Sequence, residues 1–376
     1  MVGICLLSHD PLKEYSEVGT LGHQTALYIE HLKMFDEVHV VSPNDPSSPY
    51  KLHEKIFVHT FHAPRPFNIL AGIRLVLRII ESYDIGLVRA YDEHEMGFIA
   101  SVCGKLKGIP SVASVHTDWR NFKKPGTVAY CYLRLLEKST FRLADRILPI
   151  SAYLRNIIVA HGCDPTKIEI LPNRVDSELF KPLPKNEKLR RKLGIKKPVV
   201  AYVGRLSKDK MVTYFVKCAE LFLEKANANF ILIGDGPLRG ELESYVKSKG
   251  LSSNVVFVGS VAHEVLPSYI SIADIVVCPY SGNVLLEVAS MGKPIVALDI
   301  EWHPEVIVNN ETGVLVPPDD LNSCAEALIE LLHHPEKMEQ MGWNVRKLIE
   351  DRFSWKKVTE REQEIYGRLM AKLHES

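Results

Sequence analysis

Short apolar runs rich in β-branched residues alternate with amphipathic helical patterns along almost the whole chain, and this alternation constrains the fold most strongly. Strands separated by helices form right-handed βαβ units and therefore parallel sheets. The pattern runs through the chain twice, which predicts an α/β fold with two doubly wound, Rossmann-like domains facing each other across a cleft. The expected strands are residues 2–7, 38–41, 56–60, 85–89, 111–115 and 146–150 in the first series, and 198–203, 229–233, 254–258, 274–278, 294–298 and 313–316 in the second.

The length of 376 residues suits two domains of ordinary size. Pro172, Pro182 and Pro184 interrupt any regular element around residues 171–188, so we place the junction there. The expected domains are residues 1–175 and 176–353, followed by a charged amphipathic helix within residues 354–376. Because ligands of open parallel sheets bind beyond the carboxyl ends of the strands, the motifs that directly follow strands matter most.

The charge balance and the cysteines restrict the class of protein. Lysine plus arginine and aspartate plus glutamate both number 46, so no overall charge draws the molecule to nucleic acid. The seven cysteines are odd in number and never two residues apart, which argues against a disulfide framework or a zinc site and favours a reducing compartment. The N-terminal apolar run is too short for a signal peptide, and no apolar stretch reaches membrane-spanning length. We therefore expect a cytoplasmic protein.

Two cations follow the predicted strand at residues 198–203. Arg205 stands at the strand end, and Lys210 lies five residues further on, where a helix begins. Both can converge on one anion with a helix N-terminus behind them. A diphosphate leaving group needs this compensation, and two fixed cations can replace a divalent metal. A solvated basic turn is the alternative interpretation.

Two further motifs follow strands of the second half. Gly234 and Gly236 form a tight turn whose glycine spacing does not match a dinucleotide fingerprint. Further on, Gly282 or Asn283 caps a helix whose first backbone N–H groups are free to hold phosphate. Glu287, one turn into this helix, can accept hydrogen bonds from two vicinal hydroxyls of a ribose. The alternative for Glu287 is a carboxylate that only stabilises the helix dipole or forms a salt bridge.

In order and spacing these motifs resemble those of the retaining glycosyltransferases of family four, glycosyl transferases group 1, which have the GT-B fold. The matching segments are Gly-Arg-Leu followed by Lys at 204–210, Gly-Asp-Gly-Pro-Leu at 234–238, Asn-Val-Leu-Leu-Glu at 283–287, Met-Gly-Lys-Pro at 291–294, Pro-Glu at 304–305 and Glu-Thr-Gly-Val-Leu-Val-Pro-Pro at 311–318. The likeness covers essentially the whole chain. It implies that the C-terminal helix crosses back to an acceptor-side first domain.

The resemblance also implies roles for single residues. Arg205 and Lys210 would grip the donor diphosphate, and Glu287 would hold the ribose. Gly22, in Gly19-Thr20-Leu21-Gly22, matches the glycine-rich loop that approaches the donor, and His116, after the strand at 111–115, would line the donor sugar; a lone histidine there is otherwise structural. The expected catalytic residues are His116, Arg205 and Lys210, and the expected donor-binding residues are Gly22, Gly204, Arg205, Lys210, Gly234, Gly282, Asn283, Val284, Leu285, Leu286 and Glu287.

The chain departs from the family pattern at three positions. Pro279 stands where the family usually has a glutamate that contacts the transferred sugar. Met211 replaces the glycine that usually follows the motif lysine and is expected to crowd the phosphate loop. Arg174 also replaces a glycine, either as an extra anion contact or as a solvent-facing linker residue.

We therefore expect a retaining hexosyltransferase that uses a UDP- or GDP-sugar, without metal or other cofactor, and a glycan, lipid-linked or small-molecule acceptor. The alternatives are a degenerate module that binds nucleotide or glycan, which Pro279 keeps open, and a nucleotide-sugar epimerase. Six basic residues against one acid between positions 119 and 142 suggest either a lipid phosphate or anionic membrane at the inner face, or a solvated helix face.

Overall fold

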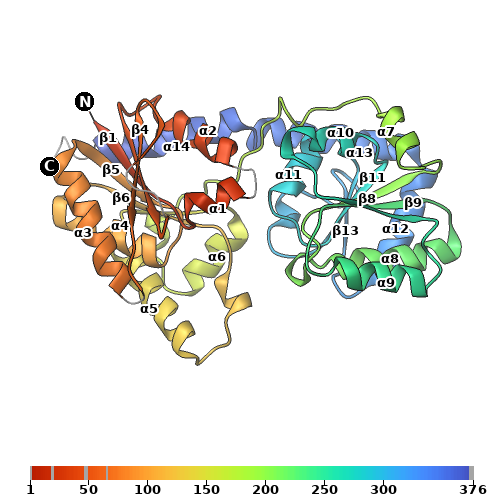
Figure 1. Cartoon of the computed structure of the whole chain (residues 1–376), viewed down its shortest axis with the longest axis horizontal. Helices are drawn as coiled ribbons and strands as arrows, with labels where there is room; N and C mark the ends of the chain where they lie inside the picture. The colour runs from red at the N-terminus through yellow and green to blue at the C-terminus, as the bar shows by residue number, and fades with distance from the viewer. Residues whose placement is uncertain (1, 18–20, 46–49, 65–66, 372–376) are drawn as a thin grey trace. The chain divides into compact units, whose positions relative to one another are not determined.

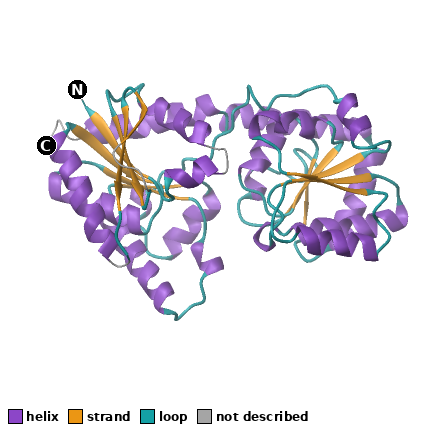
Figure 2. Cartoon of the chain, viewed as in Figure 1, coloured by secondary structure: helices purple, strands orange, loops and turns teal. Residues whose placement is uncertain are grey.

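The computed structural model describes residues 2–17, 21–45, 50–64 and 67–371, and the chain divides into two compact units. The first unit holds residues 1–172 and 359–376, and the second holds residues 173–358 (Figure 1). The sequence placed these boundaries at residues 175 and 353. Each unit has its own parallel sheet with helices packed on it (Figure 2), so the predicted pair of Rossmann-like α/β domains is confirmed.

The first unit contains a seven-stranded sheet with the strand order β3-β4-β2-β1-β5-β6-β7. All described pairings are parallel except that of the short strand β3, which pairs antiparallel with β4 and was not expected from the sequence. The strands are β1 (Gly3–Leu7), β2 (Val38–Pro43), β3 (Tyr50–His53), β4 (Ile56–Phe61), β5 (Ile85–Ala90), β6 (Ser111–Val115) and β7 (Arg146–Pro149).

Two helices of the first unit begin at a residue whose side chain caps them. The Thr127 hydroxyl accepts a hydrogen bond from the Tyr130 amide, and Ser151 does the same for Leu154. The helices are α1 (Leu12–Glu17), α2 (Leu21–His31), α3 (Phe67–Ser82), α4 (Glu95–Lys107), α5 (Val128–Leu143) and α6 (Ala152–Ala160), with short 3₁₀ turns at Trp119–Phe122 and Pro165–Lys167.

The last helix, α14 (Trp355–Ala371), joins the first unit from residue 359 onward. The guanidinium of Arg89, on β5, donates to Glu362 and to the hydroxyl of Tyr366 on this helix, and also to Ser114 at 3.2 Å. Arg89 and Glu362 are both buried, and a buried charge is tolerated only when it is paired and hydrogen bonded. This ion pair therefore fixes the helix to the sheet.

The second unit contains a six-stranded, all-parallel sheet with the order β10-β9-β8-β11-β12-β13. Its strands are β8 (Val199–Val203), β9 (Asn229–Ile233), β10 (Val255–Gly259), β11 (Ile275–Cys278), β12 (Ile295–Leu298) and β13 (Val314–Val316). The helices are α7 (Glu187–Lys192), α8 (Val212–Lys225), α9 (Arg239–Ser248), α10 (Leu266–Ser271), α11 (Asn283–Ser290), α12 (Leu321–His333) and α13 (Pro335–Arg352), with 3₁₀ turns at Lys208–Lys210, His263–Val265 and His303–Glu305. Every residue of β8, β9, β11 and β12 is buried, as expected for strands covered by helices on both faces.

Each sheet has a topological switch point, where the strand order reverses. In the first unit it lies between β1 and β5, and in the second between β8 and β11. At this point the connections from two adjacent strands run in opposite directions. The result is a crevice at the carboxyl ends of the strands, where α/β proteins bind ligands. None of the helices in the described part of the chain is long and apolar enough to cross a membrane.

Candidate functional site

The loops after β8 and β9 touch at the backbone, and glycine makes this approach possible. Gly234 has a φ of 140°, and a Cβ placed on it would lie 2.0 Å from the carbonyl oxygen of Gly204. The Gly204 amide in turn donates to the carbonyl of Ile233 at 3.0 Å. Glycine is required at Gly234 because any side chain would collide with the neighbouring backbone. The contact fixes the loop that carries Arg205 and Lys210.

Lys210 lies directly at the switch point. Its Nζ stands 5.1 Å from the ring centroid of Tyr280, which follows β11, so the loops after the two strands converge there. Desolvation lowers the pKa of Lys210, and the nearby charge of Arg205 lowers it further. Among the residues that the structure describes, no carboxylate lies within ion-pair distance of its ammonium group. Lys210 is therefore a half-buried cation that is available to an anion.

Arg205 is held differently from Lys210. Its Nη2 donates to Asp209 at 3.1 Å and its Nε to the Ser207 hydroxyl at 3.2 Å, and 63% of its side chain is exposed. The two predicted cations lie close enough for the charge of Arg205 to lower the pKa of Lys210. An anion that binds Arg205 has to compete with Asp209.

The N-terminus of α11 lies at the carboxyl end of β11. Gly282 is the N-cap and makes no side-chain hydrogen bond, while the Leu285 amide returns to the Gly282 carbonyl at 3.1 Å. Within the described part of the chain, the amides of Asn283 and Val284 have no hydrogen-bond acceptor, and Asn283 is exposed. A helix end of this kind attracts a phosphate group through its N–H groups and its dipole.

A buried histidine fixes the loop before α11. The Nδ1–H of His303 donates to the carbonyl of Leu298 at 2.9 Å, and its Nε2 accepts from the Ser281 amide at 3.3 Å. Burial lowers the pKa of His303, so the ring is neutral and one nitrogen can accept. His303 was not predicted from the sequence, although it directly precedes the Pro304-Glu305 motif.

Glu287 is buried in α11, and His263 lies against it. One carboxylate oxygen of Glu287 is 2.9 Å from Nε2 of His263, and this hydrogen bond raises the pKa of the histidine. The ring of His263 also packs on Phe180 at 5.0 Å. The role of Glu287 as a ribose ligand stays a prediction, and the histidine partner was not foreseen because it follows β10, remote in sequence.

Val284 is half-buried, and Leu285 and Leu286 are buried, so these three can contribute only backbone N–H groups to a phosphate.

Gly22 and His116, the two predicted residues of the first half, lie in the first unit. Gly22 is the second residue of α2, and a Cβ there would meet nothing within 4 Å, so the packing of the chain itself does not demand glycine. Gly19 and Thr20 lie outside the described residues. His116 follows β6 and has an exposed surface; desolvation of the charged ring, together with the positive charges of Arg89 and His9, lowers its pKa to about 4. At pH 7 His116 is therefore neutral.

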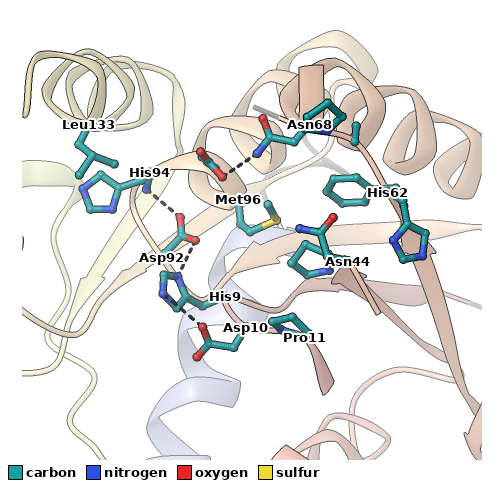
Figure 3. A pocket seen from close by; sticks show the side chains of 15 residues that line it. His9, Asp10, Pro11, Asn44, His62, Asn68, Asp92, His94, Met96 and Leu133 are labelled. Carbon is teal, nitrogen blue, oxygen red and sulfur yellow. Dashed lines mark hydrogen bonds and ion pairs between the residues drawn. The ribbon is translucent and has the colours of Figure 1, made fainter. Parts of the chain in front are cut away.

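A cavity of about 720 Å³ opens at the switch point of the first unit. His9, after β1, and Asp92, after β5, meet there with 3.0 Å between Nδ1 and the carboxylate (Figure 3). Asp92 also accepts from the amides of His94 and Gly97, so it caps α4. This hydrogen bond from His9 to the Asp92 carboxylate raises the pKa of His9 to about 9, and the same contact lowers the pKa of Asp92 against the effect of burial.

The far side of this cavity carries amide and carboxylate groups. Asn68, on α3, donates to Glu95 at 2.7 Å (Figure 3), and the hydroxyl of Tyr132 donates to the same carboxylate at 3.1 Å. Asn68 and Glu95 were not singled out from the sequence. The available signal was the run Asp92-Glu93-His94-Glu95 directly after a buried strand.

Two of the six basic residues in the stretch from 119 to 142 serve the interior of the first unit. Arg120 and Arg134 both donate to the buried carboxylate of Glu137, which also accepts from the indole of Trp119. These two arginines are therefore committed to an internal ion-pair network. Arg174, in the second unit, stands over the ring of Trp355 at 5.7 Å.

Two α/β domains, each built on a parallel sheet, define a two-domain class of fold. Its solved relatives include Anabaena Alr3699/HepE in complex with UDP, with a TM-score of 0.80 at 19% identity over 98% of this chain and 100% of that one. Sucrose-phosphate synthase from Thermosynechococcus elongatus has a TM-score of 0.79 at 19% identity, and the match covers 99% of this chain and 100% of that one. At this level of identity the likeness establishes the GT-B fold.

Sequence comparison assigns the family. The family described as "Glycosyltransferase Family 4" matches residues 25–179, and the family described as "Glycosyl transferases group 1" matches residues 185–348. Alpha-D-kanosaminyltransferase of Streptomyces kanamyceticus is 29% identical over 68% of this chain and 70% of its own length. A GDP-mannose-dependent alpha-mannosyltransferase of Mycobacterium tuberculosis is 26% identical over 85% of this chain and 86% of its own length. The chain belongs to the family 4 glycosyltransferases and is a GT-B glycosyltransferase, as the resemblance predicted.

Proposed function

We propose that the chain transfers a hexose from a UDP- or GDP-sugar to an acceptor with retention of the anomeric configuration, and that it needs no metal or other cofactor. The observation that carries this proposal is the convergence of Lys210 and the open N-terminus of α11 at one switch point. A half-buried cation and aligned N–H groups together stabilise the charge that develops on a departing diphosphate. Relatives whose names include GDP-mannose and UDP-galactose support a nucleotide-sugar donor.

In the proposed reaction the bond between the sugar and the phosphate breaks while Lys210, Arg205 and the α11 amides hold the diphosphate. The acceptor hydroxyl forms its bond on the same face, and the leaving phosphate takes its proton. No strong protein base is then required, which agrees with a neutral His116 that can share a hydrogen bond with a sugar hydroxyl. The retaining outcome is inferred from the family resemblance. Metal independence is inferred from the two cations, which supply the positive charge that a divalent ion would supply.

For the acceptor, we propose the cavity at the switch point of the first unit. Its hydrogen-bonding groups, which include His9, Asp92 and Asn68, suit the hydroxyls of a glycan, a lipid-linked sugar or a small polyol. Variants at Asp92 disturb the cap of α4 as well, so His9→Gln is the better probe. We expect it to raise the KM for the acceptor and to leave the affinity for the nucleotide unchanged.

We also propose that the protein is cytoplasmic and contacts an anionic membrane through the segment around the start of α5. Phe122, Val128 and Leu135 are exposed there with 56%, 87% and 65% of their surface, and Lys123 and Lys124 are exposed beside them. Exposed apolar side chains flanked by lysines favour anionic lipid surfaces. Sedimentation with vesicles of phosphatidylglycerol should retain the protein, whereas phosphatidylcholine vesicles should not. Equal retention by both, or by neither, contradicts this part of the proposal.

The test of the main proposal is a turnover panel of UDP-, GDP- and ADP-hexoses with and without EDTA, read by release of the nucleoside diphosphate and by NMR of the anomeric proton of the product. We expect turnover with a UDP- or GDP-hexose that persists in EDTA and an axial product from an axial donor. Loss of turnover in EDTA refutes the metal-free mechanism. An epimerised donor without release of nucleotide indicates the epimerase, and nucleotide binding without any turnover indicates a degenerate binding module.

A further inference from the structure

Two residues of the second unit, one after β8 and one after β12, have backbone conformations that are unfavourable for their side chains. Among the described non-glycine residues, positive φ angles occur at Asn44, Met211, Glu301 and Asn310. Asparagine tolerates this region, but for methionine and glutamate it is strained. Met211 follows Lys210, and Glu301, with a φ of 46°, follows β12. Strained backbone conformations of this kind occur preferentially at functional sites.

The carboxylate of Glu301 is tied to the predicted phosphate site through one side chain. The hydroxyl of Tyr280 lies 3.0 Å and 3.1 Å from its two oxygens, and the ring of the same tyrosine lies 5.1 Å from Nζ of Lys210. The charge of Glu301 acts on Lys210, since it opposes the lowering of the pKa of that lysine. Lys210, Tyr280 and Glu301 thus form a row across the carboxyl ends of β8, β11 and β12.

The acids in this part of the chain differ in what they can do. Asp209 follows β8, and Asp299 and Glu301 are the first two acids that follow β12. Asp209 is paired with Arg205, and Asp299 is exposed to solvent. Glu301 is half-buried and oriented by a tyrosine. Pro279, at the end of β11, offers no polar side chain at the position where the family pattern has a carboxylate.

A carboxylate beside a diphosphate site repels the phosphates. It can therefore favour binding only through contacts with another part of the ligand. The part of a nucleotide sugar attached to the diphosphate is a neutral polyol, and vicinal hydroxyls donate well to one carboxylate. We propose that Glu301 accepts hydrogen bonds from the hydroxyls of the donor hexose and holds the sugar against the diphosphate, in place of the carboxylate absent at Pro279. This inference rests on the proposed function and adds the residue that selects the transferred sugar.

The experiment compares the wild-type chain with Glu301→Gln, Glu301→Gly and the matched control Asn310→Gly. Turnover is measured with whichever of UDP-glucose and GDP-mannose the wild type uses, and the affinity for UDP or GDP is measured by calorimetry. We expect Glu301→Gln to lower kcat/KM by about 10- to 150-fold, the effect of losing a hydrogen bond to a charged group. The Kd of the free nucleoside diphosphate should change less than about threefold, because the sugar is absent from it.

Glu301→Gly separates a functional role from a structural one. Glycine relieves the positive φ, so the melting temperature should stay the same or rise while turnover falls as in Glu301→Gln. Asn310→Gly changes an exposed residue of the same backbone class and should leave turnover unchanged. Wild-type turnover in both Glu301 variants overturns the inference, as does an equal loss of nucleotide affinity and turnover, which would mean that Glu301 only adjusts Lys210. A wild type that uses no nucleotide sugar at all refutes the proposed function itself.

Discussion

Lys210 should contribute more to nucleotide binding than Arg205, and the structure gives the size of the difference. The perturbation is Lys210→Met, which keeps much of the stem on the ring of Tyr280 and removes the charge. A cation and a phosphate oxygen about 4 Å apart interact by about 4 kcal/mol at an effective dielectric constant of about 20. Lys210 has already lost part of its hydration in the free protein, which is why its pKa is lowered. The desolvation of the phosphate offsets part of the favourable interaction energy.

We therefore expect Lys210→Met to weaken binding of UDP or GDP by roughly 2–3 kcal/mol, which is about 30- to 150-fold in Kd. Arg205→Met should cost only about 1 kcal/mol, because the Arg205 side chain is 63% exposed and a ligand must displace Asp209 from it. Calorimetry at two salt concentrations measures both values, and the effect of Lys210 should be the less sensitive to salt, since partly buried charges are less screened. The melting temperature of Lys210→Met serves as the folding control.

Equal effects of the two variants, or a larger effect of Arg205→Met, would refute this reasoning, because exposure and prior pairing would then not govern the strength of the contact. Unchanged affinity in both variants removes the two cations from the site and with them the proposed mechanism.

Other predictions concern stability and pH. Gly234→Ala should unfold the second unit or destabilise it by more than about 3 kcal/mol, because its methyl group would lie 2.0 Å from a carbonyl oxygen; Gly240→Ala, where nothing lies within 4 Å, should stabilise helix α9 by up to about 1 kcal/mol in the same denaturant titration. Arg89→Met should lower the free energy of unfolding by about 3–5 kcal/mol because the buried Glu362 carboxylate loses its guanidinium partner, and adding Glu362→Leu should restore most of it; no recovery in the double variant contradicts that account. The pKa of His9 is raised from 6.5 to about 9 in the folded state, so its contribution to stability is complete below pH 6.5 and disappears as the pH rises to about 9. Thermal unfolding of the wild type and of His9→Gln across this range should converge at the upper end, and a constant difference would show that the pair does not titrate as described.

Local sequence patterns predicted most elements of the fold. Runs such as residues 229–233 and 294–298 are apolar without alternation, which is typical of strands covered on both faces, and both became buried central strands. Strand β3 was missed because its burial alternates and it is only four residues long, so its sequence does not differ from that of a polar loop. The first unit ends at Pro172, near the expected residue 175, and the last helix joins this unit from residue 359. The helix belongs to the first unit because Glu362 and Tyr366 contact Arg89. A helical sequence pattern does not reveal such contacts.

The sequence alone determined the family, most of the order of strands and helices, and the two cations to examine, because short motifs with fixed spacing encode a turn and the groups placed on it. The tertiary structure alone decided which of these groups are available. Arg205 is paired within its own loop, Lys210 stands against a tyrosine from the loop after β11, and Glu287 has a histidine partner 24 residues earlier in the chain. The carboxylate of Glu301 and the His9–Asp92 pair gain significance only when the sheet order brings β8 beside β11 and β1 beside β5. Burial, pairing and pKa depend on neighbours in space, and neighbours across a parallel sheet are separated in sequence by whole helices.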